Sequence, residues 1–98
     1  MNEMTANEAA KIIKEGKNFN VLDVREYHEI TEGKIPGAQH IPLGELALRK
    51  DELDADQKYI VVCRSGNRSK AACGILEAAG YKVENMVGGM QAWKGELE

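Results

Sequence analysis

One stretch of this chain decides the fold: Val61-Val62-Cys63-Arg64-Ser65-Gly66-Asn67-Arg68-Ser69. Its first residues end a β-branched segment, which predicts a buried strand up to Val62. A short polar loop with one glycine follows, and an alanine-rich helical segment starts near Ser69. The sequence therefore predicts that Cys63 lies at the carboxyl end of a strand and at the amino end of a helix.

This position favours a reactive thiol at Cys63. The N–H groups of a loop can turn toward the sulfur, and the amino end of the helix adds partial positive charge. Arg64 and Arg68 stand in the same six residues. Such surroundings favour the thiolate and lower a cysteine pKa from about 8.5 to roughly 3.5–7.5. A buried, inert cysteine needs none of these features, so we expect Cys63 to be a nucleophile within an anion-binding loop.

The rest of the chain alternates helices and strands. A capping box of Thr5 and Glu8 opens the first expected helix. The patterns predict helices over residues 5–14, 26–32, 43–49, 68–79 and 90–94, and strands over 20–24, 39–41, 58–62 and 83–87. This alternation predicts an α/β fold with a mostly parallel sheet and helices on both faces. Ligands bind such sheets beyond the carboxyl ends of the strands, which is where Cys63 is expected.

Length and composition narrow the possible functions. The 98 residues predict a single domain over 1–98, and the net charge of −3 argues against nucleic acid as a partner. No stretch approaches the roughly 18 apolar residues of a membrane span, and the polar first residues do not form a signal peptide. Cys63 and Cys73 do not suggest a disulfide framework, so we expect a reducing cytoplasm. The last two residues, Leu97 and Glu98, are given no weight in the predicted fold.

Four ordered motifs resemble the rhodanese family of sulfurtransferases in its small, single-domain form. They are Val21-Leu22-Asp23-Val24-Arg25-Glu26, Glu32-Gly33-Lys34-Ile35-Pro36-Gly37-Ala38 with His40-Ile41-Pro42, the loop Cys63-Arg64-Ser65-Gly66-Asn67-Arg68-Ser69, and Val87-Gly88-Gly89-Met90-Gln91-Ala92-Trp93. The resemblance extends from about Thr5 to Trp93. It implies a rhodanese-like three-layer sandwich and the transfer of sulfane sulfur through a cysteine persulfide, without a metal or organic cofactor.

The resemblance, together with the chemistry of the loop, gives each residue an expected role. Cys63 is the expected nucleophile of a thiosulfate sulfurtransferase, in which it accepts sulfur and passes it to cyanide or to a thiol. The residues expected to bind the small sulfur-containing anion are Arg64, Ser65, Gly66, Asn67, Arg68 and Ser69. A protein thiol such as thioredoxin is an expected acceptor. The domain is expected to be a monomer or a weak dimer.

Other polar residues are expected to have structural roles. Asp23 and Arg25 are expected to support the site, with Asp23 bonded to backbone or to an arginine. Cys73 is expected to pack in the core, although it could instead be a resolving thiol for Cys63. His28 and His40 have no ligand spacing, so no metal site is predicted.

Two other functions compete with sulfur transfer. Cysteine phosphatases and arsenate reductases also use an anion-binding loop, but those phosphatases place five residues between the cysteine and the arginine, whereas four separate Cys63 from Arg68. The tighter ring suits one sulfur atom better than a tetrahedral phosphate. A persulfide carrier or docking module is the second alternative. It would form the same persulfide on Cys63 yet use free thiosulfate poorly.

Overall fold

The central strand of the fold, β4 (Lys58–Val62), ends just before Cys63 and so places this residue at the carboxyl end of a parallel sheet. The computed structural model describes residues 2–16 and 18–98. The sheet has the strand order β1-β5-β4-β2-β3, with β1 at Asn2–Thr5, β2 at Asn20–Asp23, β3 at Gln39–His40 and β5 at Lys82–Val87. Every pair of neighbouring strands is parallel, so the carboxyl ends of all these strands lie on the same side of the molecule.

Side chains of β4 alternate between two cores, as expected for a sheet covered on both faces. Tyr59 and Val61 pack toward one face together with Cys63, whereas Ile60 and Val62 pack toward the other. All five are buried, with exposed fractions of 3% or less. Residues 59–62 of the strand are therefore a continuous apolar run, and the loop begins directly after them at Cys63.

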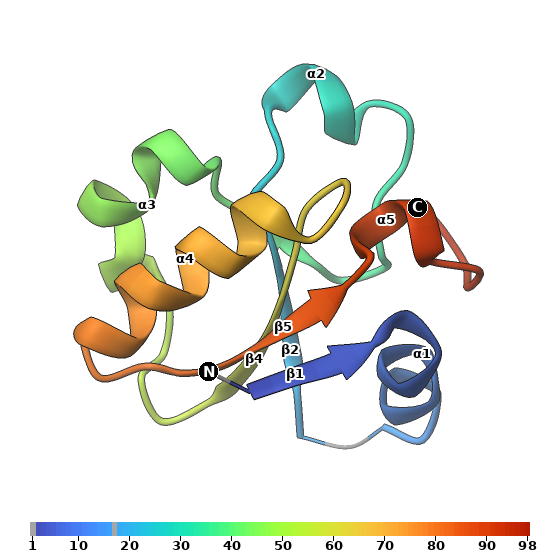
Figure 1. Cartoon of the computed structure of the whole chain (residues 1–98), viewed down its shortest axis with the longest axis horizontal. Helices are drawn as coiled ribbons and strands as arrows, with labels where there is room; N and C mark the ends of the chain where they lie inside the picture. The colour runs from blue at the N-terminus through green and yellow to red at the C-terminus, as the bar shows by residue number, and fades with distance from the viewer. Residues whose placement is uncertain (1, 17) are drawn as a thin grey trace.

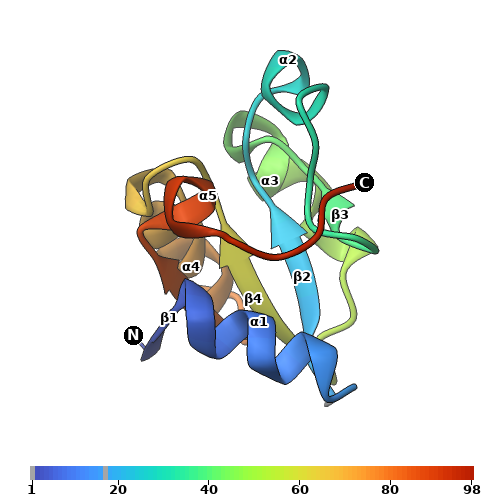
Figure 2. The same cartoon turned by 90° about the vertical axis from the view of Figure 1, so that its right-hand side faces the viewer.

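Helices cover both faces and complete three layers. On one face lie α3 (Leu43–Arg49) and α4 (Asn67–Ala78), and on the other lie α1 (Ala6–Lys14) and α5 (Gly89–Ala92) (Figure 1). The short helix α2 (Tyr27–Ile30) stands beyond the carboxyl ends of the strands, above the sheet (Figure 2). A 3-10 turn at Lys50–Glu52 follows α3. Among the described residues, no helix has the length and apolar character needed to span a bilayer.

The predicted elements are found with shifts of a few residues at their ends, and the fold class is confirmed. α3 and β4 have the predicted bounds, and Thr5 and Glu8 form the predicted capping box at the start of α1. Strand β1 was not predicted, because residues 2–5 are mostly polar and the helix signal begins at Thr5. In the structure Met4 is buried and pairs with Met86 of β5. The sheet therefore has one more strand than expected, next to β5.

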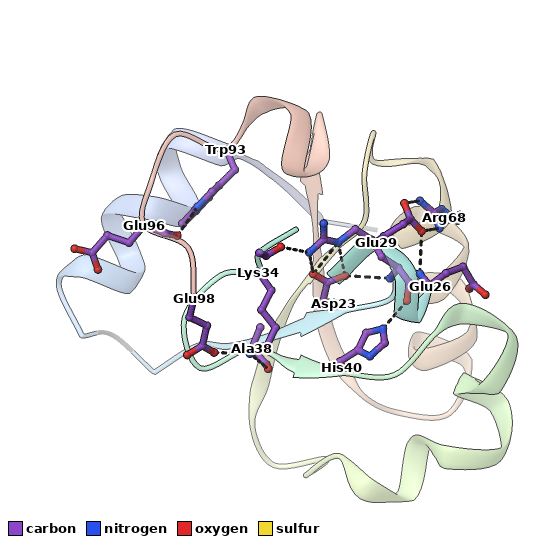
Figure 3. Close-up of polar contacts among 12 residues, drawn as sticks. Asp23, Glu26, Glu29, Lys34, Ala38, His40, Arg68, Trp93, Glu96 and Glu98 are labelled. Carbon is purple, nitrogen blue, oxygen red and sulfur yellow. Dashed lines mark hydrogen bonds and ion pairs between the residues drawn. The ribbon is translucent and has the colours of Figure 1, made fainter. Parts of the chain in front are cut away.

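The last two residues also take part in the structure. Glu98 exchanges two backbone hydrogen bonds with Lys34, with N···O distances of 2.8 and 3.2 Å. Its carboxylate accepts from the Gly37 amide. The same carboxylate pairs with the Lys34 ammonium (Figure 3). Leu97 lies against Gly33. The segment after α5 is therefore fastened to the turn before β3, which the sequence alone did not indicate.

Two leucines on α3 provide a test of the described core. Leu46 is fully buried and Leu48 is 89% exposed, although both lie on the same short helix. We expect Leu46→Ala to lower the free energy of unfolding by about 2–5 kcal/mol, because it leaves a cavity. Leu48→Ala should change it by less than about 0.5 kcal/mol. Urea denaturation of both variants measures the difference, and equal effects would contradict the described orientation of α3.

Candidate active site

The loop after β4 wraps around the sulfur of Cys63. The Gly66 amide donates to Cys63 Sγ at 3.0 Å, and Ser69 Oγ lies 3.3 Å from the same sulfur. Gly66 is the N-cap of α4, so the sulfur also lies at the amino end of a 12-residue helix. Two of the residues predicted to form an anion-binding loop, Gly66 and Ser69, thus contact the thiol, which itself is buried.

These donors shift the protonation of Cys63. Burial alone raises the pKa of the thiol, because a buried thiolate loses its hydration. The Ser69 hydroxyl and the amides of Ser69, Gly66 and Ser65 lower the pKa by more, so that the net pKa lies below that of an ordinary cysteine. The loop therefore favours the nucleophilic form at Cys63.

Two glycine positions allow the loop to close. Gly66 has a φ of 101°, a region that side chains rarely adopt, and an added Cβ would lie 3.1 Å from the Gly88 nitrogen. At Gly89 an added Cβ would lie 2.4 Å from the Cys63 carbonyl oxygen. The start of α5 is thus pressed against the loop. Amides of Met90 and Gln91 donate to the carbonyls of Cys63 and Arg64 at 2.8 and 3.0 Å.

Arg68 is held by a carboxylate that the loop does not contain. Its Nη1 and Nη2 donate to the two carboxylate oxygens of Glu29 at 2.6 and 2.8 Å, joining α4 to α2 (Figure 3). The Arg68 guanidinium is the main reason why the pKa of Glu29 falls to about 2. A guanidinium carries five N–H donors. Two are used here, so the predicted role of Arg68 in binding an anion stays open.

Asp23 and Arg25 form a buried pair at the end of β2. Asp23 accepts from the Arg25 backbone amide and from its guanidinium, at 2.8–3.0 Å. Arg25 Nη2 also donates to the Gly33 carbonyl at 2.8 Å, and His40 Nε2 lies 2.6 Å from the Arg25 carbonyl (Figure 3). These contacts fasten the segment around α2 to the sheet. They include the expected bond between Asp23 and an arginine, and the supporting role of both residues at the site stays a prediction.

The remaining predicted residues lie at the mouth of the loop. Arg64 is exposed and helps to line an open cavity of about 350 Å³. The cavity is lined by Arg25, His28, Glu29, Glu32, Arg64, Met90 and Gln91. Ser65 contributes its amide to the sulfur, and Asn67 is the exposed first residue of α4. The cavity is where a small anion could approach the loop.

Cys73 is far less acidic than Cys63. It is fully buried in the same core, and burial raises its pKa to about 12. Both cysteines are free thiols. Almost no Cys73 thiolate exists at neutral pH, which favours the core role over that of a resolving thiol. Among residues 2–16 and 18–98, no three His, Cys, Asp or Glu side chains are grouped to hold a metal ion.

Sequence reasoning missed two residues at this site. Glu29 pairs with Arg68, and Asn85 of β5 accepts a hydrogen bond from Ser69 at 2.5 Å. Asn85 could have been noticed as an amide among the apolar residues of a predicted strand. Glu29 carried no such signal, because it is one of several acidic residues in a polar helix.

Residues 5–96 match the family described as the rhodanese-like domain. The chain belongs to the rhodanese family. YtwF of Bacillus subtilis, provisionally named a sulfurtransferase, is 42% identical to it over 86 residues, which are 88% of this chain and 84% of YtwF.

Two further relatives cover nearly all of the chain. A protein of Allochromatium vinosum named a sulfurtransferase is 33% identical over 94 residues, 95% of this chain and 88% of its own. The crystal structure of a rhodanese-like domain protein from Staphylococcus aureus superposes with a TM-score of 0.93 at 34% identity, covering 100% of this chain and 97% of that one. The resemblance inferred from the four motifs is confirmed.

Gly89 tests how tightly α5 closes the loop. We expect Gly89→Ala to lower the free energy of unfolding by about 2 kcal/mol or more, because the new methyl group meets the Cys63 carbonyl at a positive φ. Gly44→Ala is the matched control. Nothing lies within 4 Å of a Cβ at this α3 position, and alanine favours the helix by about 0.5–1 kcal/mol. Urea denaturation should give opposite signs. A tolerated Gly89→Ala would show that α5 can move away from the loop.

The ion pair between Glu29 and Arg68 predicts a pH-dependent contribution to stability. Because folding lowers the pKa of Glu29 from 4.5 to about 2, the contribution is fully present above pH 4.5 and is lost as the pH falls toward 2. We therefore expect Glu29→Gln to be less stable than the wild type at pH 7 and to approach it near pH 2.5. Chemical denaturation at both pH values measures this. A difference independent of pH would mean that the pair does not shift the titration of Glu29.

Proposed function

We propose that this protein moves sulfane sulfur from thiosulfate or a similar donor to an acceptor through a persulfide on Cys63. The observation that carries the proposal is the setting of the Cys63 thiol at the end of β4. The Gly66 amide donates a hydrogen bond to its sulfur, and the loop lowers its pKa. Membership of the rhodanese family and relatives named as sulfurtransferases support it. The specific donor and acceptor are part of the proposal.

The first step transfers sulfur from the donor to the protein. The Cys63 thiolate attacks the outer sulfur of thiosulfate, and a new S–S bond forms at Cys63. The S–S bond of thiosulfate breaks, and sulfite leaves with the electron pair. Before the step, the thiolate carries one negative charge and thiosulfate carries two. After it, the persulfide carries one and sulfite carries two, so the charge balances. Sulfite is stable as a dianion, so the leaving group needs no proton from an acid.

The second step returns Cys63 to its starting state. An acceptor thiolate attacks the outer sulfur of the persulfide, and Cys63 leaves as a thiolate. Cyanide would react in the same way and give thiocyanate. A protein thiol such as that of thioredoxin is the proposed acceptor in the cell. A low thiol pKa helps here, because the thiolate of a more acidic thiol is the better leaving group.

The loop lowers the barrier by holding the charge of the transferred sulfur. The amides of Ser65, Gly66 and Ser69 already lower the pKa of Cys63, and amides of this loop would surround a sulfur added to it. Preorganised donors of this kind stabilise developing charge without reorganising during the reaction. Arg64 and Arg68 would attract the anionic donor through charge-assisted hydrogen bonds. Part of the Arg68 charge is offset by Glu29, which leaves Arg64 as the more available cation.

Intact-mass spectrometry after incubation with thiosulfate tests the proposal. We expect wild-type protein to gain one sulfur atom that cyanide removes, and Cys63→Ser to gain none. Cys73→Ser is the matched control, since Cys73 is a buried thiol outside the loop, and it should gain sulfur as the wild type does. Sulfur on Cys63→Ser but not on Cys73→Ser would move the nucleophile to Cys73.

Other sulfur donors and a phosphate-ester assay, used beside the thiosulfate experiment, distinguish the alternatives. Transfer only from a persulfidated protein donor, with no gain from thiosulfate, would make the chain a persulfide carrier. No gain from any donor, together with Cys63-dependent hydrolysis of a phosphate ester, would favour a phosphatase and overturn sulfur transfer. The ring of four residues between Cys63 and Arg68 argues against the phosphatase outcome.

A further inference from the structure

Asn85 is a buried polar side chain that the proposed reaction does not use. It lies in β5 between Glu84 and Met86 and is 2% exposed. Its Oδ1 lies 2.5 Å from Ser69 Oγ, and Ser69 Oγ lies 3.3 Å from Cys63 Sγ. Its Nδ2 lies 3.3 Å from the Gly66 carbonyl and 3.2 Å from a carboxylate oxygen of Glu3. A chain of contacts therefore runs from the reactive sulfur to β1.

The partners of Asn85 fix which way its amide faces. The Gly66 carbonyl and an ionised Glu3 carboxylate can only accept hydrogen bonds. The amide group that faces both must therefore be the donor, Nδ2. The carbonyl oxygen of Asn85 consequently faces Ser69. Since this oxygen can only accept, the Ser69 hydroxyl must donate to it.

A hydroxyl group has one proton to donate. While Cys63 is a thiol, its S–H can donate to Ser69 Oγ, and the Ser69 proton can remain on Asn85. Both contacts are then satisfied. Once Cys63 is a thiolate, its sulfur can only accept. Ser69 can then help the thiolate only by turning its proton from Asn85 toward Sγ, which leaves the buried Asn85 oxygen without a donor.

We propose that Asn85 and Cys63 compete for the single hydroxyl proton of Ser69, and that Asn85 is thereby a positioning residue that limits how readily Cys63 becomes a thiolate. The acidic proton of Cys63 leaves to water, and the Ser69 proton changes partner without leaving its oxygen. The inference rests on the proposed function only in taking Cys63 as the reacting atom. It assigns a role in thiol activation to a side chain outside the loop.

Other charged groups around Cys63 must be accounted for when Asn85 is replaced. Arg68 interacts electrostatically with Cys63 and is paired with Glu29. The short helix α5, whose amides bond the loop, has no ionisable side chain. The remaining charged groups on the elements that pack around Cys63 are Arg64 in the loop, Lys70 and Glu77 on α4, the Asp23–Arg25 pair at the end of β2, the Glu45–Arg49 pair on α3, Lys58 on β4, and Lys82 and Glu84 on β5. Replacing Asn85 also removes a hydrogen-bond partner of Glu3 on β1 and of the Gly66 carbonyl. The Glu3→Gln variant and the Ser69→Ala background control for these two contacts, so the part of the Asn85 effect that depends on Ser69 reports on the Ser69 proton.

The pH dependence of Cys63 alkylation by iodoacetamide tests the competition in the Cys73→Ser background. Asn85→Leu removes the competing acceptor, so we expect a lower pKa for Cys63 and alkylation about 2- to 10-fold faster at a pH below that pKa. Ser69→Ala removes the donor to the thiolate, so we expect a higher pKa and slower alkylation. In the Ser69→Ala background, Asn85→Leu should have no further effect, because no proton is left to compete for.

Opposite signs for the two single variants separate this role from a merely structural one. Loss of loop structure would raise the pKa of Cys63 in both, because the amides that lower it would move away from the sulfur. That result would overturn the proposal, as would an Asn85→Leu effect that persists without Ser69. Glu3→Gln keeps an acceptor for Asn85 and should leave the rate within about 2-fold of the wild type. If Asn85→Leu does not fold, Asn85→Val is used, with the same expected sign. Alkylation needs no sulfur donor, so a failed persulfide experiment and a failed competition are distinguishable.

Discussion

The hydrogen bond from the Gly66 amide to the Cys63 sulfur is the contact around which the loop is organised. It requires the chain to reverse within three residues of Cys63, and Gly66 provides the positive φ for that reversal. The reversal brings the backbone of the loop against Gly89, where a side chain could not fit. Surrounding the thiol with amides thus requires glycine at two positions, Gly66 and Gly89, that lie more than twenty residues apart in the chain.

Charge around the site is balanced in pairs. Arg68 is joined to Glu29, and Arg25 to Asp23, so two of the three arginines at the site carry a carboxylate partner. Both pairs tie the α2 region to the rest of the fold, one through α4 and the other through β2. Electrostatic attraction for an anion and mechanical attachment of α2 are therefore properties of the same side chains. Only Arg64, among these three, has its charge uncompensated by such a pair in the described part of the chain.

The sequence predicted the fold to the extent that the signals were local. The β-branched run into Cys63, the capping box at Thr5 and the glycines after the helices all act through neighbours in the chain, and the structure has these elements where expected. Strand β1 escaped prediction because its pairing with β5 depends on residues eighty positions away. The same reason applies to the partners of the loop: Glu29 and Asn85 reach Arg68 and Ser69 only once the strands are in register, and no spacing in the sequence reveals that meeting.

The two outer strands, β1 and β3, have features that disfavour pairing with a strand of another chain. Unpaired N–H and C=O groups on an edge strand invite a strand from another chain, which is a route to aggregation. Here β3 offers two residues before Pro42, which has no N–H to donate, and β1 turns polar side chains of Asn2, Glu3 and Thr5 to solvent. The flanks of this sheet therefore give an incoming strand little to extend, even though its centre is a run of aliphatic residues.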